Sequence, residues 1–328
     1  MKYFKASHLK KELESVVKAG HPRGEFTGFK PLNEIFTLKK GYPLFIAGLP
    51  HAGKSEFVLE VLLNTSVRYG WKHFIYSGES GSVAEIISEL AHKLISKPYR
   101  DGTFAMTEKE RLIAEMFIND HFVFMDTDMD FTVSEFYQFV QEAEQEYGFK
   151  FDTTTIDPFN DVKEELSEYG GREDKWLRRE LKRIRIMSKK NNRIDILVNH
   201  VADIKPVYDK DSNAQYTPVP LPSQWAGGRT WHRRAFTMLV VYRPAIFMKN
   251  ENGEPYLENE TLIINQKAKP KGTGKIGRAS LFFDWKKNRY YWNEMGKEQF
   301  AFKLNQESKF VANSFLQSQE TDMNDLPF

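Results

Sequence analysis

The residues with the clearest chemistry form one short motif near the start of the chain. Gly48 is followed, after four residues, by Gly53-Lys54-Ser55, which fits the pattern G-x-x-x-x-G-K-[ST]. The apolar run 42–47 before it predicts a buried strand, and residues 56–63 after it carry a helical pattern. A strand, a Gly-rich turn and a helix in this order predict a P-loop, in which backbone N–H groups surround a nucleotide phosphate.

This motif assigns a role to each of its residues. Lys54 reaches the β- and γ-phosphate oxygens, and Ser55 offers its hydroxyl to Mg²⁺. We therefore expect ATP and Mg²⁺ as cofactors. The nucleotide-binding residues predicted from this segment are Gly48, Pro50, His51, Ala52, Gly53, Lys54, Ser55 and Glu56.

Hydrolysis of a nucleotide also needs carboxylates, and two acidic residues follow predicted strands. Asp157 follows the strand 151–156, where it would hold the metal through water, although three threonines replace the usual apolar residues of such a strand. Glu79 follows the strand 73–77, where it could polarise a water that faces the γ-phosphate. Taken singly, either residue could instead be a surface or capping carboxylate.

The elements that position these residues alternate along the chain. Strands predicted at 73–77, 121–126, 151–156 and 194–198 alternate with helices, whereas residues 97–120 remain ambiguous. This alternation predicts an α/β fold with a mostly parallel sheet that helices cover on both faces. After a long Pro-rich connection, further strands are predicted at 237–242, 261–265 and 279–283, with 290–292 as another candidate.

Composition limits the possible classes of protein. The chain has 328 residues, 41% hydrophobic and 28% charged, with no cysteine and a net charge of only +2. It therefore predicts one large domain without disulfides, and no apolar run is long enough to span a membrane. We expect a cytoplasmic protein, in bacteria or in a phage-infected cell. Residues 172–193 hold ten Lys/Arg against three Asp/Glu, which suits a phosphate backbone or, equally, a solvated helix face.

The order of these motifs resembles the RecA-like replicative helicases of superfamily 4, which include bacterial DnaB and mitochondrial Twinkle. The resemblance covers residues 26–292. It implies that Glu79, within Ser-Gly-Glu-Ser 77–80, is the catalytic glutamate and that Asp157 is the Walker B aspartate. His200, at the end of the next strand, corresponds to the residue that senses the γ-phosphate.

The same resemblance implies sites in the second half of the chain. Gly228, Arg229, Arg233 and Arg234 correspond to a DNA-contacting loop. Residues 266–274 resemble a segment that reaches the ATP site of the neighbouring subunit, through Lys267 and Lys269. Lysine stands here where the family has an arginine finger, so either Lys269 or another residue such as Arg278 does this work.

The expected organisation has three parts. Residues 1–24 form an amphipathic helix and linker that would hold a homo-oligomeric ring, a hexamer in family terms, through Leu9, Leu13 and Val16; docking on its own domain is the alternative. Residues 25–295 form the RecA-like ATPase domain. Residues 296–328 form a polar, acidic and disordered tail, whose end, Asp322–Phe328, resembles the tip of single-stranded-DNA-binding proteins and would recruit primase, polymerase or proteins that bind such tips.

Three classes of function agree with this pattern. The leading hypothesis is an ATP-driven helicase motor that moves on single-stranded DNA, and the family implies 5′-to-3′ movement. The first alternative is a RecA-like recombinase that coats DNA as a filament. The second is an ATP-gated helicase loader or replication scaffold.

Overall fold

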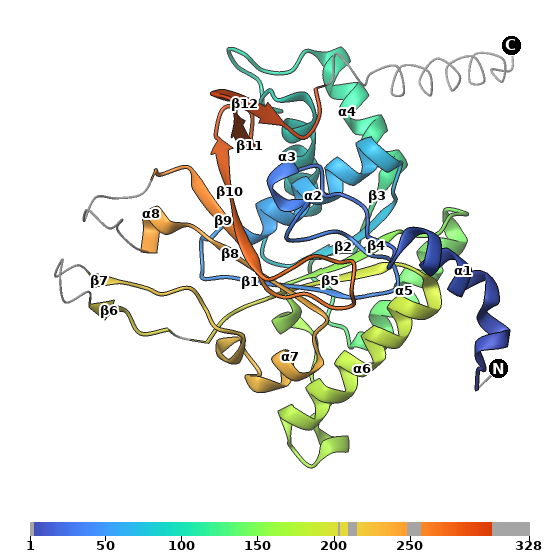
Figure 1. Cartoon of the computed structure of the whole chain (residues 1–328). Helices are drawn as coiled ribbons and strands as arrows, with labels where there is room; N and C mark the ends of the chain where they lie inside the picture. Colours follow the sequence, from blue (N-terminus) through green and yellow to red (C-terminus); the bar gives the residue numbers. More distant parts are fainter. Residues whose placement is uncertain (1–2, 203, 209–214, 248–256, 304–328) are drawn as a thin grey trace, which may run out of the picture.

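The structure is a computed structural model that describes residues 3–202, 204–208, 215–247 and 257–303. Its centre is a ten-stranded sheet with the order β12-β11-β10-β9-β8-β1-β5-β4-β2-β3 (Figure 1). The strands are β1 Leu44–Ala47, β2 His73–Ser77, β3 Phe122–Phe124, β4 Thr153–Asp157, β5 Ile194–Asn199, β8 Thr237–Tyr242, β9 Glu260–Lys267, β10 Gly277–Asp284, β11 Arg289–Glu294 and β12 Lys297–Phe300. A separate two-stranded ribbon pairs β6 Val207–Tyr208 with β7 Gln215–Tyr216.

The first half of the sheet is parallel, as the alternation of strands and helices predicts. β1 lies between β5 and β8, with Ala47 opposite Asn199 on one side and Val240 on the other. β4 and β2 continue the parallel order, with Ser77 opposite Asp157. The carboxyl ends of these strands therefore share one edge of the sheet, where ligands of open α/β sheets bind.

The second half is antiparallel, and it continues past the boundary expected at residue 295. β9 runs antiparallel to β8, and β10, β11 and β12 follow as a meander. Phe302, just after β12, is buried. The sheet thus includes residues that the sequence pattern assigned to the tail, because the four residues of β12 show no clear apolar alternation.

Helices cover both faces of the sheet. They are α2 Lys54–Tyr69, α3 Val83–Ile95, α4 Glu108–His121, α5 Val133–Glu146, α6 Glu173–Asn191, α7 Arg229–Arg234 and α8 Pro244–Phe247. Helices α2, α3 and α4 pack into one hydrophobic core and α5, α6 and α7 into the other. Figure 1 shows the two groups on opposite sides of the sheet.

Helix α4 lies in the segment whose sequence pattern is ambiguous. Thr107 caps its first turn: the threonine hydroxyl accepts the Glu110 N–H at 3.2 Å, and the Glu110 carboxylate accepts the Thr107 N–H at 2.9 Å. This is a capping box, T-x-x-E, and it is the signal in the sequence that could have predicted the helix.

The three threonines of β4 are buried, and two of them pair with buried polar side chains of neighbouring elements. Thr153 Oγ1 lies 2.8 Å from His73 Nδ1, and the Thr154 hydroxyl donates to Asp195 at 2.6 Å. A strand with this polar pairing does not need the apolar run that a Walker B strand usually has.

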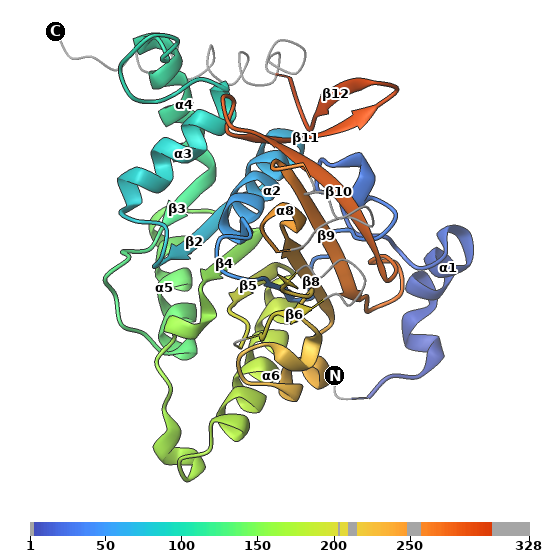
Figure 2. The same cartoon turned by 90° about the vertical axis from the view of Figure 1, so that its left-hand side faces the viewer.

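The first helix stands at the periphery of the molecule, away from both cores. α1 spans Lys10–Ala19 after a 3-10 turn at Ala6–Leu9, and none of its residues is buried (Figure 2). Val17 is 85% exposed and Leu13 47%. Among the described residues, the apolar side of α1 is therefore largely exposed.

No helix in the described ranges is long and apolar enough to cross a membrane. The tail segment Asp322–Phe328 lies outside the described residues.

Candidate functional site

The Gly48–Ser55 loop joins β1 to α2 in the conformation that a P-loop requires. Gly53 is the N-cap of α2 and has a φ of +85°, which favours glycine, and His51 has a φ of +60°. At Gly48 a side chain would bring Cβ to within 2.4 Å of the Val241 carbonyl oxygen. Both glycines of the motif are thus dictated by the path of the backbone. Pro50 and His51 are exposed at the tip of the loop, and Ala52 is buried beneath it.

Lys54 extends back over the loop. Its Nζ donates to the carbonyls of Gly48 and Leu49, both at 3.3 Å, and the residue is only 8% exposed. Burial lowers the pKa of Lys54, while Asp157 and Glu79 act in the opposite direction. The ammonium group therefore sits beside the loop where phosphate oxygens would replace carbonyls as its partners.

Asp157 ends β4 beside Ser55, with which it shares a hydrogen bond. Burial raises the pKa of Asp157 to about 6, against the opposing effects of the Ser55 hydrogen bond and the Lys54 charge. A hydroxyl and a carboxylate side by side form an oxygen donor set that suits Mg²⁺, a hard cation that prefers oxygen ligands. The residues present therefore fit the metal that a nucleotide would bring.

Glu79 and His200 meet across the same edge of the sheet. Glu79 follows β2 and His200 follows β5, and His200 Nε2 lies 2.9 Å from Glu79 Oε1. The Glu79 side chain is 55% exposed, and the His200 side chain 31%. Water can reach the carboxylate, as a group that activates water requires. The sequence could place each residue only at a strand end; their mutual contact comes from the parallel order of the strands.

Three further residues surround Glu79, and sequence reasoning missed them. Asn160 Oδ1 accepts the His200 backbone N–H at 2.9 Å. The Tyr76 hydroxyl shares a hydrogen bond with Asp161, whose pKa is raised by burial and by the Glu79 charge. A side chain at Gly78 would bring Cβ to within 2.6 Å of both groups, so the Tyr76 and Asp161 side chains would have to move to make room for it. In the sequence, the polar Asn160-Asp161 pair shortly after β4 is the signal that could have pointed to these residues.

Lys267 and Lys269 lie at the opposite edge of the sheet from the P-loop. Lys267 pairs with Met238, close to the start of β8, whereas the P-loop follows the end of the neighbouring β1. Lys267 Nζ donates to the His232 carbonyl, and burial lowers its pKa. Arg278 pairs with Ile264 close to the same edge. No hydrogen bond or ion pair of the described residues joins these cations to the P-loop of their own chain. Glu56, which was predicted to bind nucleotide, forms an ion pair with Lys93 of α3 at 2.5 Å.

The predicted DNA-contacting residues lie on and beside α7. Gly228, with a φ of +65°, precedes the helix, and Arg229, Arg233 and Arg234 are carried on it. Arg233 and Arg234, with Thr230 and with Arg178 of α6, surround an open hollow of about 240 Å³. Arg178 belongs to the basic run 172–193 of the sequence but was not predicted as a contact. The hollow is lined by three guanidinium groups, which suits an anionic ligand.

The sheet order and the Gly48–Ser55 loop together define a RecA-like α/β fold with a P-loop. The structure matches a solved ATPase domain with a TM-score of 0.71, at 16% identity, covering 89% of this chain and 100% of that one. It matches a DnaB-like replicative helicase, described together with its interactions with primase, with a TM-score of 0.68, at 17% identity, covering 88% and 68% of the two chains. The α/β RecA-like fold predicted from the sequence is therefore confirmed.

The amino-acid sequence also resembles that of a known protein over part of the chain. The chain is 28% identical over 150 residues to the Twinkle homolog protein, chloroplastic/mitochondrial, of Arabidopsis thaliana. That match covers 44% of this chain but only 21% of the relative's length. No family model matches the chain. The resemblance to the DnaB-like and Twinkle-like helicase ATPase domains is thus confirmed, by fold over most of the chain and by sequence over part of it.

Proposed function

We propose that this chain is the ATP-driven motor of a replicative DNA helicase, which moves on single-stranded DNA as a ring. The observation that carries the proposal is the convergence of Lys54, Glu79, Asp157 and His200 on one edge of the sheet, with Glu79 and His200 in contact at 2.9 Å. The fold shared with helicase ATPase domains supports the same class of activity.

In this proposal the P-loop amides and Lys54 bind the phosphates of ATP. Ser55 and, through water, Asp157 would hold Mg²⁺, and the ion would supply positive charge against the negative charge that develops on the phosphates. Glu79 accepts the proton of the attacking water. His200 positions the Glu79 carboxylate and is placed to contact the γ-phosphate.

The contacts of the loop after β5 support a link between the ATP site and DNA. The Ala226 N–H donates to the His200 carbonyl at 3.1 Å, and Asn199 Nδ2 donates to the Ala226 carbonyl at 3.3 Å. Ala226 precedes Gly228 and the arginines of α7 by a few residues. A shift of His200 on hydrolysis would therefore reach the proposed DNA contacts, Gly228, Arg229, Arg233 and Arg234, through a short stretch of backbone.

Two features support a ring. Lys267 and Lys269 lie at the edge opposite the P-loop of their own chain, so a neighbouring subunit is the partner whose ATP they could reach. The apolar residues of α1 are exposed, which suits a helix that packs on the adjacent protomer. A hexamer with 5′-to-3′ movement is the assembly that we propose.

We also propose contacts with other replication proteins. The DnaB-like relative is described with primase, and a primase is one candidate partner here. Polymerase and proteins that bind the tips of single-stranded-DNA-binding proteins are the others, recruited by Asp322–Phe328. The proposed compartment is the cytoplasm of a bacterium or of a phage-infected cell.

One observation favours a second function. Lys269 stands where an arginine finger is expected, and a lysine cannot form the planar bidentate contact with phosphate that arginine forms. Slow turnover for this reason would suit an ATP-gated loader or scaffold.

The direct test of the ATP site is the variant Lys54→Ala, measured by steady-state ATP hydrolysis with and without single-stranded DNA. We expect turnover to fall to background, because the buried ammonium that contacts the phosphates is lost. Arg68→Ala, at the far end of the same helix, should leave turnover unchanged. Persistent hydrolysis by Lys54→Ala would remove the P-loop from the mechanism.

A further inference from the structure

Tyr290 of β11 reaches the P-loop from a strand more than two hundred residues away in the sequence. Its hydroxyl lies 3.4 Å from the Gly53 carbonyl oxygen, to which it can donate, and shares a second hydrogen bond with Thr261 of β9. The side chain is almost fully buried, and its ring packs edge-on against Phe57 and Phe29. A side chain at Gly53 would bring Cβ to within 2.8 Å of this hydroxyl, so loop and tyrosine fit closely.

The Gly53 carbonyl belongs to the peptide group that begins α2. It accepts the Phe57 N–H at 3.0 Å, the first hydrogen bond of the helix. The Gly53–Lys54 peptide is trans, so its N–H points away from its carbonyl, out of the amino end of the helix. Holding this carbonyl therefore fixes the direction in which the Lys54 N–H faces a bound phosphate.

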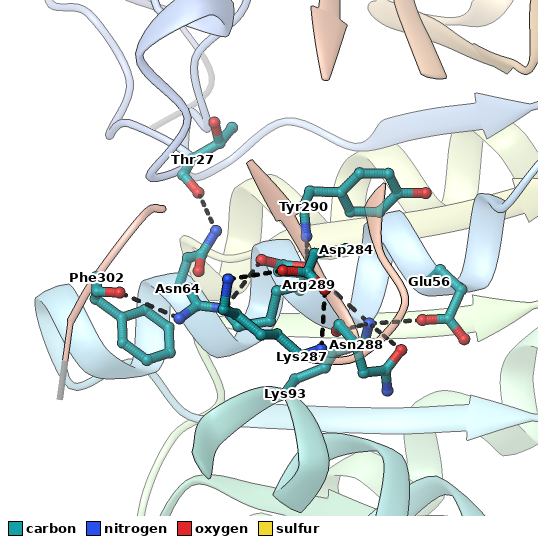
Figure 3. Close-up of polar contacts among 11 residues, drawn as sticks. Thr27, Glu56, Asn64, Lys93, Asp284, Lys287, Asn288, Arg289, Tyr290 and Phe302 are labelled. Carbon is teal, nitrogen blue, oxygen red and sulfur yellow. Dashed lines mark hydrogen bonds and ion pairs between the residues drawn. The ribbon is translucent and has the colours of Figure 1, made fainter. Parts of the chain in front are cut away.

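A buried ion network holds Tyr290 against the same helix (Figure 3). The Tyr290 N–H donates to Glu60 Oε2 at 2.7 Å, and Glu60 is fully buried. Glu60 lies between Arg289, at 3.4 Å, and Lys93 of α3, at 4.0 Å. Tyr290 is thus attached to α2 at two points, by its amide to Glu60 and by its hydroxyl to Gly53.

We propose that Tyr290 is a positioning residue of the phosphate-binding loop, whose hydroxyl holds the Gly53 peptide so that the Lys54 N–H is oriented for phosphate before nucleotide binds. This inference rests on the proposed ATP site. A donor that is already oriented binds without an ordering cost, which strengthens ground-state binding of the nucleotide. Tyr290 contacts no reacting atom, so its effect falls on nucleotide affinity and KM rather than on kcat.

The test is the variant Tyr290→Phe, which removes the hydroxyl and keeps the ring. Binding of ADP and of ATP, each with Mg²⁺, is measured by calorimetry on the full chain, together with KM and kcat for hydrolysis. We expect roughly three- to tenfold weaker binding, the effect of one lost hydrogen bond, with KM raised by a similar factor and kcat within about twofold of wild type.

Tyr291→Phe is the matched control. Its hydroxyl accepts a hydrogen bond from Asn259 Nδ2 at 3.1 Å, at a site away from Gly53, so this variant also loses one hydroxyl from β11. It should keep wild-type affinity. Urea unfolding of both variants shows whether they differ in global stability.

The possible outcomes distinguish a failure of the positioning role of Tyr290 from a failure of the proposed ATP site. Weaker binding by Tyr290→Phe alone supports the positioning role. Wild-type affinity in Tyr290→Phe, or equal weakening in both variants, overturns it and leaves nucleotide binding in place. If the wild-type chain binds no nucleotide, the proposed ATP site itself is wrong, and the inference falls with it.

Discussion

Lys54 is a buried cation that has no carboxylate within ion-pair distance among the described residues. Its ammonium donates only to two carbonyls of its own loop, and burial lowers its pKa. Leaving a charge so poorly compensated is costly unless a ligand supplies the opposite charge. Glu79 and Asp157 lie near enough to raise the pKa of Lys54 but not to pair with it, and the phosphates of a nucleotide would complete the site.

Glu79 gives the sharpest prediction for a single residue. Glu79→Gln keeps the size of the side chain and its hydrogen bond to His200 but cannot accept the proton of the attacking water. We expect nucleotide affinity within about threefold of wild type and a loss of turnover on the order of a hundredfold or more. Single-turnover hydrolysis beside equilibrium nucleotide binding measures the two effects separately.

Glu85→Gln is a suitable control, because Glu85 caps α3 shortly after the same turn and contacts Ser82. It should hydrolyse ATP normally. Near-normal hydrolysis by Glu79→Gln would mean that the base is another group, and Asp161 would be the next candidate.

The elements explain which parts of the site could be predicted from the sequence. Lys54, Glu79, Asp157 and His200 each follow a predicted parallel strand or the loop after one, and parallel strands bring such residues to one edge. Tyr290 could not be found in this way, because its contact with Gly53 depends on the packing of an antiparallel strand against α2. Nor could the extent of the sheet, since β12 has only four residues and no clear alternation.

His73, the first residue of β2, provides a prediction about the packing of the elements. It is fully buried between Ser66 of α2, at 2.9 Å, and Thr153 of β4, at 2.8 Å. Burial lowers its pKa well below the ordinary 6.5. In the window below 6.5 the unfolded chain binds a proton that the folded chain does not, so this group makes the free energy of unfolding fall as the pH falls.

The size of this effect is limited to about 1.4 kcal/mol for each pH unit below 6.5. His73→Gln keeps a polar side chain between Ser66 and Thr153 but has no proton to gain. Urea unfolding of both proteins at about pH 7.5, 6.5 and 5.5, which span the ordinary histidine pKa, should show a steeper loss of stability in the wild type. Parallel pH profiles would show that His73 does not remain neutral in the fold.

For the whole molecule, we propose that the exposed apolar face of α1 is where one protomer meets the next. Leu13→Glu places a charge on the apolar face, so we expect the ring to dissociate at concentrations where the wild type remains assembled. Ser15→Glu adds the same charge on the polar face and should assemble normally. Mass photometry across a dilution series compares the three proteins, and an intact Leu13→Glu ring would assign assembly to other surfaces.

Unwinding of a forked DNA duplex is the decisive experiment, run beside ATP hydrolysis with and without single-stranded DNA on the same preparation. A helicase motor should show hydrolysis that DNA stimulates and strand separation that requires hydrolysis, with Lys54→Ala inactive in both assays. Hydrolysis without strand separation would contradict the helicase motor and favour a filament-forming ATPase or a loader.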